Sequence, residues 1–371
     1  MRIAINAAIV DPFISGLGVY TVSLCRELAK LHDDVLVYTA YPGICGGSAA
    51  QLRRIRWGRE VTSWSMQHAR RLLWTQTVLP LRLVADRATI LFSPLPEGML
   101  APMMPQVIVV HDVLPLRFPA EYPRQQYYFR HLVPAMLRKA RAVVAVSEST
   151  KRDLLMFYRL DARGIQVIPG GYDRDRYRVG LASEEIRARY GLQGYILYVG
   201  NLLPHKNLQQ LLNAFARISA KVPHTLVIAG RKDPRYYPGL EAETEALGLQ
   251  TRVSFLDYVP VEDLPALYAG ADVFIHPSVY EGFGLPILEA MACGTPVIAS
   301  RTSSIPEVAG NAAMLVDPGD ASAIASGLET VLGDRRIREG MQQKGLAQAA
   351  QFGWGATAVA ILNILNKVAT L

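Results

Sequence analysis

The sequence of 371 residues lacks the features that define several classes of protein. It has only three cysteines, Cys25, Cys45 and Cys293, and their odd number and wide spacing argue against a disulfide framework or a zinc site. No run of eighteen apolar residues is present, which argues against a transmembrane helix. The first residues, MRIAINAAIVDPF, lack the basic and then apolar order of a signal peptide, so we expect a cytoplasmic protein with reduced thiols.

The charge of the chain is uneven, because acidic residues are few in its first half. Residues 1–180 contain 24 Lys and Arg against 14 Asp and Glu, whereas the remaining residues contain 15 against 18. A basic half suits contact with an anionic ligand or surface. No nucleic-acid recognition motif accompanies the scattered arginines, so we expect no nucleic-acid partner.

Short runs of β-branched residues alternate with helical patterns along the chain, which is typical of parallel sheets covered by helices. The polar segment between Gly170 and Leu192 has no buried-strand pattern and separates two such series. The sequence therefore predicts an α/β protein with two tandem Rossmann-like, doubly wound domains, residues 1–180 and 181–353. We expect them to face a cleft and to bind ligand at the carboxyl ends of their strands. A final amphipathic helix, residues 354–371, is expected to pack back across the junction to the first domain.

The stretch YEGFGLPILEAMACGTPVIAS places two acids around a glycine loop. Glu281 precedes Gly282 and Gly284, Pro286 suits the first turn of a helix, and Glu289 falls inside that helix. Backbone N–H groups at such a turn approach a ligand closely, and the helix N-terminus favours an anion. Ionised carboxylates accept hydrogen bonds from vicinal hydroxyls. The combination predicts a nucleotide sugar, although taken singly Glu281 would more often be a solvated loop acid and Glu289 a salt-bridged helix residue.

The stretch VGNLLPHKNL follows the first strand of the second domain and brings Lys206 towards the same ligand. A lysine ammonium at this point neutralises charge that develops on a leaving diphosphate. Read alone, Lys206 would more often be a surface residue. We expect donor contacts from both loops, namely Gly200, Asn201, His205 and Lys206 in one, and Gly282, Phe283, Gly284, Leu285 and Glu289 in the other.

EGFGLPILEAMACGTPVIAS resembles the E-x7-E signature of the retaining nucleotide-sugar glycosyltransferases of family 4, which have the GT-B fold. The resemblance continues through YILYVGNLLPHKNLQQLLNAF and SSIPEVAGNAAMLVDPGD, and it is weaker at SGLGVYT, VIVVHDVLP and VSESTKRDL. Family members often carry Arg-Lys where this chain has His205-Lys206, which leaves Lys206 as the main expected phosphate ligand. The motifs look most like bacterial mannosyl- and rhamnosyltransferases of polysaccharide assembly, so GDP-mannose is the first expected donor.

In the first domain, the resemblance gives roles to residues whose patterns are ambiguous. Gly16 and Gly18 form either a tight strand-to-helix turn or, as the family loop implies, an amide contact with the donor phosphate or the acceptor. His111 ends a buried strand and is either structural or, as in the family, close to the donor sugar. Ser147 is expected to cap a helix.

Two other patterns concern metal and membrane. Asp173 and Asp175 have the D-x-D form of metal-dependent glycosyltransferases, but they lie in the linker, and with Lys206 and a helix N-terminus near the diphosphate we expect no metal cofactor. The segment 52–74 mixes arginine with tryptophan, which fits either a membrane interface or an ordinary helix packed on a sheet. Its members are Arg53, Arg54, Arg56, Arg59, Arg70, Arg71, Trp57, Trp64 and Trp74.

The resemblance implies a retaining glycosyltransferase that moves a sugar from a nucleotide diphosphate to a hydroxyl of a glycan or lipid-linked acceptor. Glu281, His111 and Lys206 are the expected catalytic residues. A nucleotide-sugar epimerase of the same architecture and a non-catalytic binder of nucleotide sugars are the alternatives. The protein is expected in the cytoplasm, with the basic first domain as a candidate contact for the anionic inner face of the membrane.

Overall fold

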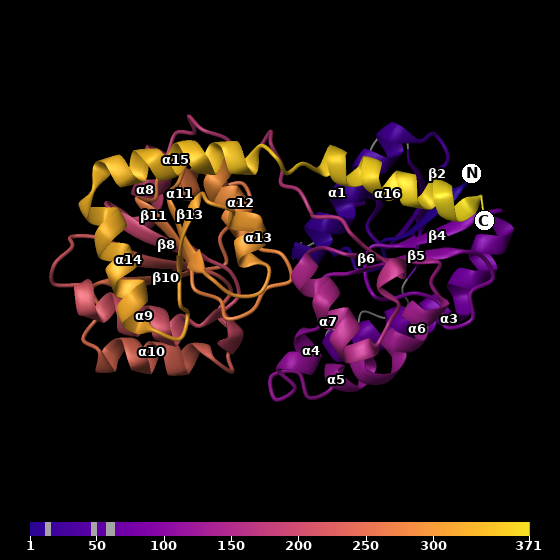
Figure 1. Ribbon diagram of the computed structural model, residues 1–371, viewed down its shortest axis with the longest axis horizontal. Helices are drawn as coiled ribbons and strands as arrows, with labels where there is room; N and C mark the ends of the chain where they lie inside the picture. Colours follow the sequence, from indigo (N-terminus) through magenta and orange to yellow (C-terminus); the bar gives the residue numbers. More distant parts are fainter. Residues whose placement is uncertain (12–15, 46–49, 57–63, 371) are drawn as a thin grey trace. The chain divides into compact units, whose positions relative to one another are not determined.

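The computed structural model describes residues 1–11, 16–45, 50–56 and 64–370. The chain divides into two compact units, which Figure 1 shows in sequence colours. Unit 1 consists of Met1–Gly171 together with Trp354–Leu371, and unit 2 consists of Tyr172–Gly353. The chain thus leaves unit 1 once and returns to it at its end.

Unit 1 is built on a parallel sheet of seven strands in the order β3-β2-β1-β4-β5-β6-β7. Apart from the edge strands β3 and β7, these strands are buried apolar runs, as expected for a parallel sheet with both faces covered. The order reverses between β1 and β4, which makes a topological switch point there. The strands are β1 (Ile3–Asn6), β2 (Val35–Thr39), β3 (Gln51–Arg54), β4 (Ile90–Ser93), β5 (Gln106–Val110), β6 (Ala142–Ala145) and β7 (Ile165–Val167).

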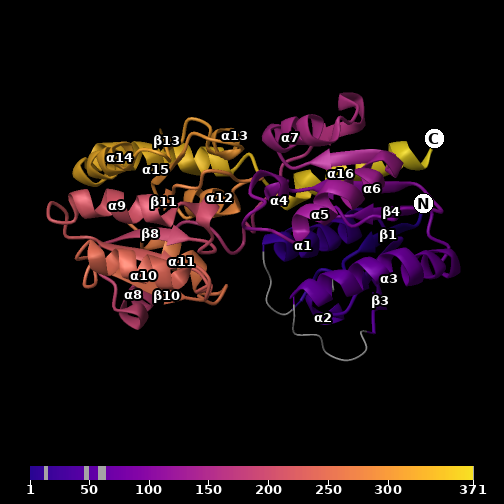
Figure 2. The same ribbon diagram turned by 90° about the horizontal axis from the view of Figure 1, so that it is seen from below.

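The helices of unit 1 cover both faces of this sheet (Figure 2). They are α1 (Gly16–Leu31), α2 (Pro42–Cys45), α3 (Trp64–Ala85), α4 (Leu114–Arg117), α5 (Gln125–Tyr127), the π-helix η1 (Tyr128–Leu132), α6 (Val133–Lys139), α7 (Glu148–Tyr158), the 3₁₀ turn η2 (Ala162–Gly164) and α16 (Trp354–Ala369). The last helix, α16, packs on α1, as Figure 1 shows, and the side chain of Thr357 donates a hydrogen bond to the carbonyl oxygen of Pro169. The predicted return of the final helix to the first domain is confirmed.

One stretch of the described residues, Arg335–Ala369, is long and apolar enough by length and composition to cross a membrane. It consists of two separate helices, α15 (Arg335–Ala349) and α16. Helix α16 buries one face inside unit 1, including Ile361, Ile364 and Leu365. Its apolar composition is therefore that of a core helix.

Unit 2 repeats the pattern with six parallel strands in the order β10-β9-β8-β11-β12-β13. Its strands are β8 (Tyr195–Val199), β9 (Thr225–Ala229), β10 (Val253–Asp257), β11 (Val273–His276), β12 (Val297–Ser300) and β13 (Ala313–Val316). Besides α15, its helices are α8 (Glu184–Tyr190), the 3₁₀ turn η3 (Pro204–Lys206), α9 (Leu208–Ile218), α10 (Tyr237–Ala246), α11 (Leu264–Ala269), α12 (Leu285–Ala292), α13 (Ile305–Ala309) and α14 (Ala321–Gly333). The order reverses between β8 and β11, so the loops after these two strands meet at the switch point.

Alternate residues of each strand supply two separate cores. In β8, Tyr195 and Leu197 join one buried cluster, and Ile196 and Tyr198 join the other. This alternation follows from the pleat, which directs successive side chains to opposite faces. The central strand of unit 2 is thereby fixed on both sides, and the loops at its carboxyl end start from a rigid base.

The predicted α/β fold with two Rossmann-like domains is confirmed. The boundary between the units lies at 171, however, rather than at 180 as the sequence pattern placed it. The ring of Tyr177 is buried in a core cluster of unit 2, and the guanidinium of Arg174 donates hydrogen bonds to the carbonyl oxygens of Ala350 and Phe352. Residues that appear as a polar linker in the sequence thus belong to unit 2.

Candidate active site

The switch point of unit 2 brings together the two loops that the sequence singled out. Lys206 ends η3 in the loop after β8, and Glu281 lies in the loop after the neighbouring strand β11. The backbone N–H of Val279 donates a 2.9 Å hydrogen bond to the carbonyl oxygen of His205, which ties the two loops together. Neighbouring strands therefore place the predicted lysine and acid side by side.

Lys206 and His276 share one oxygen of Glu281. The ammonium Nζ of Lys206 donates to Oε1 of Glu281 at 2.6 Å, and Nε2 of His276 lies 2.8 Å from the same oxygen. Burial raises the pKa of Glu281, but the charge of Lys206 and the hydrogen bond from His276 outweigh it and hold this pKa well below its usual range. Glu281 is thus an anion at neutral pH, and neither contact uses its Oε2.

His276 is held rigidly at the carboxyl end of β11. Its side chain is 1% exposed, and its ring stacks with those of Tyr198 and Phe274 at centroid distances of 6.3 and 5.9 Å. An ionised carboxylate only accepts hydrogen bonds, so Nε2 of His276 carries the hydrogen in this contact. The packing therefore fixes one donor on Glu281 independently of Lys206.

Hydroxyl groups from the loop after β12 support the glycine loop. The backbone N–H of Glu281 donates to Oγ of Ser303 at 2.9 Å. Oγ of Ser304 lies 2.9 Å from the carbonyl oxygen of Glu281 and 2.8 Å from that of Phe283, to which it donates. These bonds satisfy backbone groups beneath the loop, and they set the position of Glu281 from a third strand of the sheet.

Helix α12 begins directly after this loop. Gly284 precedes the helix with φ of +120°, a backbone conformation that glycine adopts far more readily than other residues. Pro286 is the second residue of α12, as predicted, where its missing N–H costs no hydrogen bond. The partial positive charge of the helix N-terminus therefore lies next to the loop that carries Glu281.

Glu289, the second acid, has a different environment. It is the fifth residue of α12, and its Oε2 accepts a 3.0 Å hydrogen bond from the hydroxyl of Tyr268. Burial raises the pKa of Glu289 to about 7, and the bonds from Tyr268 and Tyr177 oppose this only in part. In the ligand-free protein Glu289 is thus bonded to phenols, and it changes charge near neutral pH.

The other predicted donor contacts of unit 2 lie around the same two loops. Gly200 follows β8 and lies against Gly230, which follows the neighbouring strand β9. A Cβ on Gly230 would lie 1.8 Å from the carbonyl oxygen of Gly200, so the two strand ends approach too closely for a side chain on Gly230. His205 is 2% exposed, which makes its side chain part of the loop's packing. Asn201 is exposed, Leu285 begins α12, and the ring of Phe283 lies 6.0 Å from that of Phe352.

In unit 1 the predicted residues lie at the start of α1 and directly after β5. Gly16 and Gly18 fall in the first turn of α1, and a Cβ at Gly16 would meet no atom of the described residues within 4 Å. Nε2 of His111 lies 2.8 Å from the carbonyl oxygen of Pro94, which only accepts, so Nε2 carries the hydrogen. Burial lowers the pKa of His111 to about 4, with the bond to Pro94 opposing, and the imidazole is neutral at pH 7.

The structure also describes two other features that the sequence singled out. Oγ of Ser147 accepts a hydrogen bond from the N–H of Thr150 at 3.0 Å, which confirms it as the cap of α7. Oδ1 of Asp173 accepts from the N–H groups of Asp175 and Arg176, as in an ordinary turn. Within the described ranges, no group of three His, Cys, Asp or Glu side chains is arranged to hold a metal ion.

Sequence reasoning missed several residues that shape this site. His276 could have been found by the signal that marked His111, a polar residue at the end of a buried strand. Tyr177 and Tyr268 do not follow a buried strand and so carry no such signal. In the sequence, Tyr177 appears in a polar segment and Tyr268 in a helix, and neither position indicates a contact with Glu289. Ser303 and Ser304 act on backbone atoms more than twenty residues away, which no local pattern records.

Two Rossmann-like units in tandem, with the last helix returned to the first, define the GT-B class of fold. Solved structures of this class superpose over nearly the whole chain. Sucrose-phosphate synthase from Thermosynechococcus elongatus matches with a TM-score of 0.83 and 22% identity over 99% of both chains. WaaG, a glycosyltransferase of lipopolysaccharide biosynthesis, matches with a TM-score of 0.75 and 19% identity over 98% of this chain and 99% of its own. At these identities the likeness concerns the fold.

Two family models together match most of the sequence. The model of Glycosyltransferase Family 4 matches residues 14–176, and the model of Glycosyl transferases group 1 matches residues 182–348. The chain belongs to the glycosyltransferase family that these models describe.

Curated relatives agree with this family. O-antigen chain mannosyltransferase B of Escherichia coli is 35% identical over 259 residues, which are 67% of this chain and 66% of the relative. The serotype-specific mannosyltransferase WbdA of Escherichia coli is 28% identical over 263 residues, 68% of this chain but only 32% of its own. The similarity thus spans just under two thirds of one relative and about a third of the other.

Proposed function

We propose that this protein is a retaining glycosyltransferase that moves mannose from GDP-mannose to a hydroxyl of a glycan or glycolipid acceptor in bacterial polysaccharide assembly. The observation that carries the proposal is the ion pair of Lys206 and Glu281 at the switch point of unit 2, beside the start of α12. The O-antigen mannosyltransferases among the relatives support mannose as the sugar.

Glu281 is suited to hold the sugar. Its ionised carboxylate accepts hydrogen bonds, and its Oε2 is not used by Lys206 or His276, whose bonds both go to Oε1. A sugar hydroxyl that donates to Oε2 would thus meet a carboxylate already fixed in place. Such preorganisation favours a transition state whose geometry demands a precise position of the sugar ring.

Lys206 is suited to hold the diphosphate. An ammonium has three donors, and the bond to Glu281 uses one of them. The remaining two are available to phosphate oxygens, and the N–H groups from Gly282 to Leu285 add further donors at the start of α12. As the bond between the sugar C1 and the phosphate oxygen breaks, the negative charge that develops on the phosphate would be stabilised by both.

The expected mechanism needs no covalent nucleophile. The acceptor oxygen attacks C1 from the face on which the phosphate leaves, and the departing phosphate oxygen takes the proton of the acceptor hydroxyl. The new bond to C1 therefore has the configuration of the old one. Glu289 would hold the ribose hydroxyls, and the roles of Gly16, Gly18 and His111 remain predictions of the family resemblance. We propose that no metal takes part, since Lys206 and the helix N-terminus supply the positive charge.

The test is a panel of nucleotide sugars offered with mannose-containing acceptors to wild-type protein and to Glu281→Gln. We expect release of GDP and an α-configured product from GDP-mannose by the wild type, and a loss of at least a hundredfold in kcat in the variant. Glu339→Gln is the matched control, because its carboxylate is an exposed partner of Arg335 within α15 and has no part in the two loops of the site. Epimerised donor without free nucleoside diphosphate would instead identify an epimerase, and binding without turnover a non-catalytic binder.

We further propose that the protein works in the cytoplasm, with basic unit 1 at the inner face of the membrane where lipid-linked acceptors are found. Unit 1 contains 22 Lys and Arg against 12 Asp and Glu, so it would be drawn to an anionic surface.

A further inference from the structure

The arginine and tryptophan segment of the sequence does not form one surface. The guanidinium of Arg71 bonds to the buried carboxylate of Glu97 at 2.9 Å, and Arg53 pairs with Asp86 at 3.0 Å. Trp74 is 9% exposed, and its ring lies 6.3 Å from that of Tyr38. Trp57 and Arg59 lie outside the described residues, as does the side chain of Trp64. Several residues of this segment are therefore interior or paired, as in an ordinary helix packed on a sheet.

Helix α3 instead exposes an apolar face that its sequence does not reveal. Met66, Leu73, Leu81 and Val84 are 60%, 65%, 70% and 55% exposed. Their spacings of seven, eight and three residues place them along one side of the helix. We call these four residues the α3 stripe. Figure 2 shows α3 along an outer side of unit 1.

The stripe is a genuine excess of apolar surface rather than the ordinary scatter of exposed side chains. Among the described residues, α3 carries five of the exposed large apolar side chains, the four of the stripe and Val78. The opposite side of the same helix already fills the core with Leu79 and Leu83. Helix α3 is thus apolar on two sides, which indicates a partner for the outer one.

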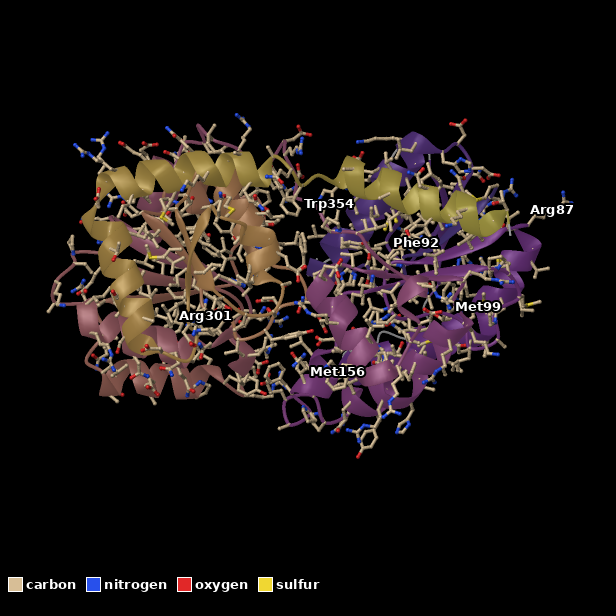
Figure 3. The ribbon with its side chains drawn as sticks, viewed as in Figure 1. Arg87, Phe92, Met99, Met156, Arg301 and Trp354 are labelled. Atoms are coloured by element: carbon tan, nitrogen blue, oxygen red, sulfur yellow. The ribbon has the colours of Figure 1, made fainter. Side chains whose placement is uncertain are left out.

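The charges around the stripe favour an anionic partner. Helix α3 contains no Asp or Glu, and Arg82 lies near its C-terminal end. Arg87 follows the helix and reaches away from the ribbon at the end of unit 1 (Figure 3). Asp86, the acid between them, accepts hydrogen bonds from Arg53 and from the hydroxyl of Tyr38. A bilayer of anionic lipid complements this positive charge, whereas a second copy of this chain would bring no acid on α3 to meet it.

We propose that the α3 stripe docks on a bilayer of anionic phospholipid, with its apolar side chains at the boundary between headgroups and acyl chains and with Arg82 and Arg87 on lipid phosphates. Aliphatic side chains flanked by arginine, without an acid on the helix, have the pattern of an interfacial helix. The inference rests on the membrane location proposed above and specifies the surface that makes the contact, whereas sugar transfer is a separate property.

The experiment is sedimentation of the full chain with vesicles, in the absence of nucleotide sugar and acceptor. Vesicles of phosphatidylcholine alone are compared with vesicles that contain about 30% phosphatidylglycerol, at low and high salt. The stripe variant carries Leu73→Gln and Leu81→Gln. The matched control carries Met103→Gln and Met156→Gln, which are also in unit 1 and are 63% and 58% exposed. All four positions are at the surface, so equal thermal unfolding of the variants verifies that each is folded.

We expect the wild type and the control to bind the anionic vesicles at least tenfold more tightly than the neutral ones, with weaker binding in high salt. The stripe variant should bind at least tenfold more weakly than the control, and Arg82→Gln should reduce the preference for anionic vesicles. Equal binding by the stripe variant and the control would overturn the proposal. So would a wild-type dimer in light scattering that the stripe variant loses, without any vesicle binding, since the stripe would then join two copies. Because no substrate is present, neither result depends on whether the protein transfers sugar.

Discussion

The pair of Lys206 and Glu281 allows stability and catalysis to be separated by substitution. The side chains are 15% and 13% exposed, so the pair is largely shielded from water. Lys206→Met removes the ammonium and leaves Glu281 as an enclosed charge that retains His276. Removing one partner of a buried pair costs about 3–5 kcal/mol, and the partial exposure of both groups places the loss near about 3 kcal/mol. In a unit of this size, that loss lowers Tm by about 6–12 °C.

A second substitution in the same chain distinguishes the two roles. Glu281→Gln removes the uncompensated charge of the Lys206→Met variant, and the amide oxygen can still accept a hydrogen bond from His276. The double variant should therefore recover more than half of the lost stability. Its activity should stay at least a hundredfold below wild type. The ammonium that is proposed to bond to the phosphate and the carboxylate that is proposed to bond to the sugar hydroxyls are both still absent.

The pH dependence of stability tests whether the enclosed charge of Glu281 causes the loss in the Lys206→Met variant. In the wild type the pKa of Glu281 is depressed, so its stabilising effect is present above the unfolded pKa and is lost as the pH falls. Without Lys206, we expect burial, the largest single cause acting on this carboxyl, to outweigh the remaining contact with His276 and to raise this pKa. A raised carboxyl pKa destabilises the fold increasingly as the pH rises above the unfolded value of about 4.3. The stability deficit of Lys206→Met should thus be larger at pH 8 than at pH 5.

Unfolding should be followed by calorimetry or circular dichroism. Tryptophan fluorescence would report on unit 1, whereas Lys206 and Glu281 lie in unit 2. The four tryptophans of unit 1 are Trp57, Trp64, Trp74 and Trp354. A Lys206→Met protein as stable as the wild type would refute the reasoning about the pair. Recovery of activity in the double variant would refute the assignment of Lys206 to the diphosphate.

Two further predictions concern the second acid and the metal. Because the pKa of Glu289 is raised to about 7, its ionised fraction grows between pH 6 and 8, and the donor KM should fall by up to about tenfold over this range if ribose bonds to the ionised form. Glu289→Gln should remove this pH dependence, and an unchanged profile in the variant would take Glu289 out of the donor site. Transfer should continue in excess EDTA, and Asp173→Asn and Asp175→Asn should each change the initial rate less than twofold. Activity that EDTA abolishes and magnesium or manganese restores would require a metal in the mechanism.

The sequence predicted the fold because buried parallel strands leave a strong pattern. Runs such as the one before His111 are almost entirely apolar, and in both sheets such runs alternate with helices. The boundary between the units was less predictable. Tyr177 lies among charged residues in the sequence, but its ring is large enough to enter the core of unit 2 while its neighbours stay at the surface. Mean polarity of a segment does not report where a single aromatic ring is anchored.

The sequence placed Lys206 and Glu281 near one ligand, since residues that follow the strands of a parallel sheet lie at the same edge, but it did not predict the ion pair between them. What the sequence could not give was the number of partners on each oxygen. His276 and Lys206 both use Oε1, and this detail depends on how the ring of His276 stacks with Tyr198 and Phe274. The outer face of α3 was hidden for a similar reason. Leu73 and Trp74 are adjacent and both apolar, but only the helix direction decides that the first is exposed and the second is buried.

The two acids of the E-x7-E stretch are chemically alike and structurally opposed. Glu281 lies beside a cation and a histidine and keeps its charge, whereas Glu289 lies beside phenols and is close to losing its own. In the proposed mechanism this difference separates the two roles. Glu289 gains its charge only as the pH rises through about 7, so its hold on the ribose hydroxyls depends on pH, whereas the hold of Glu281 on the sugar does not in this range. Glu281 must remain charged, because it both anchors Lys206 and orients the sugar at the carbon where the bonds change.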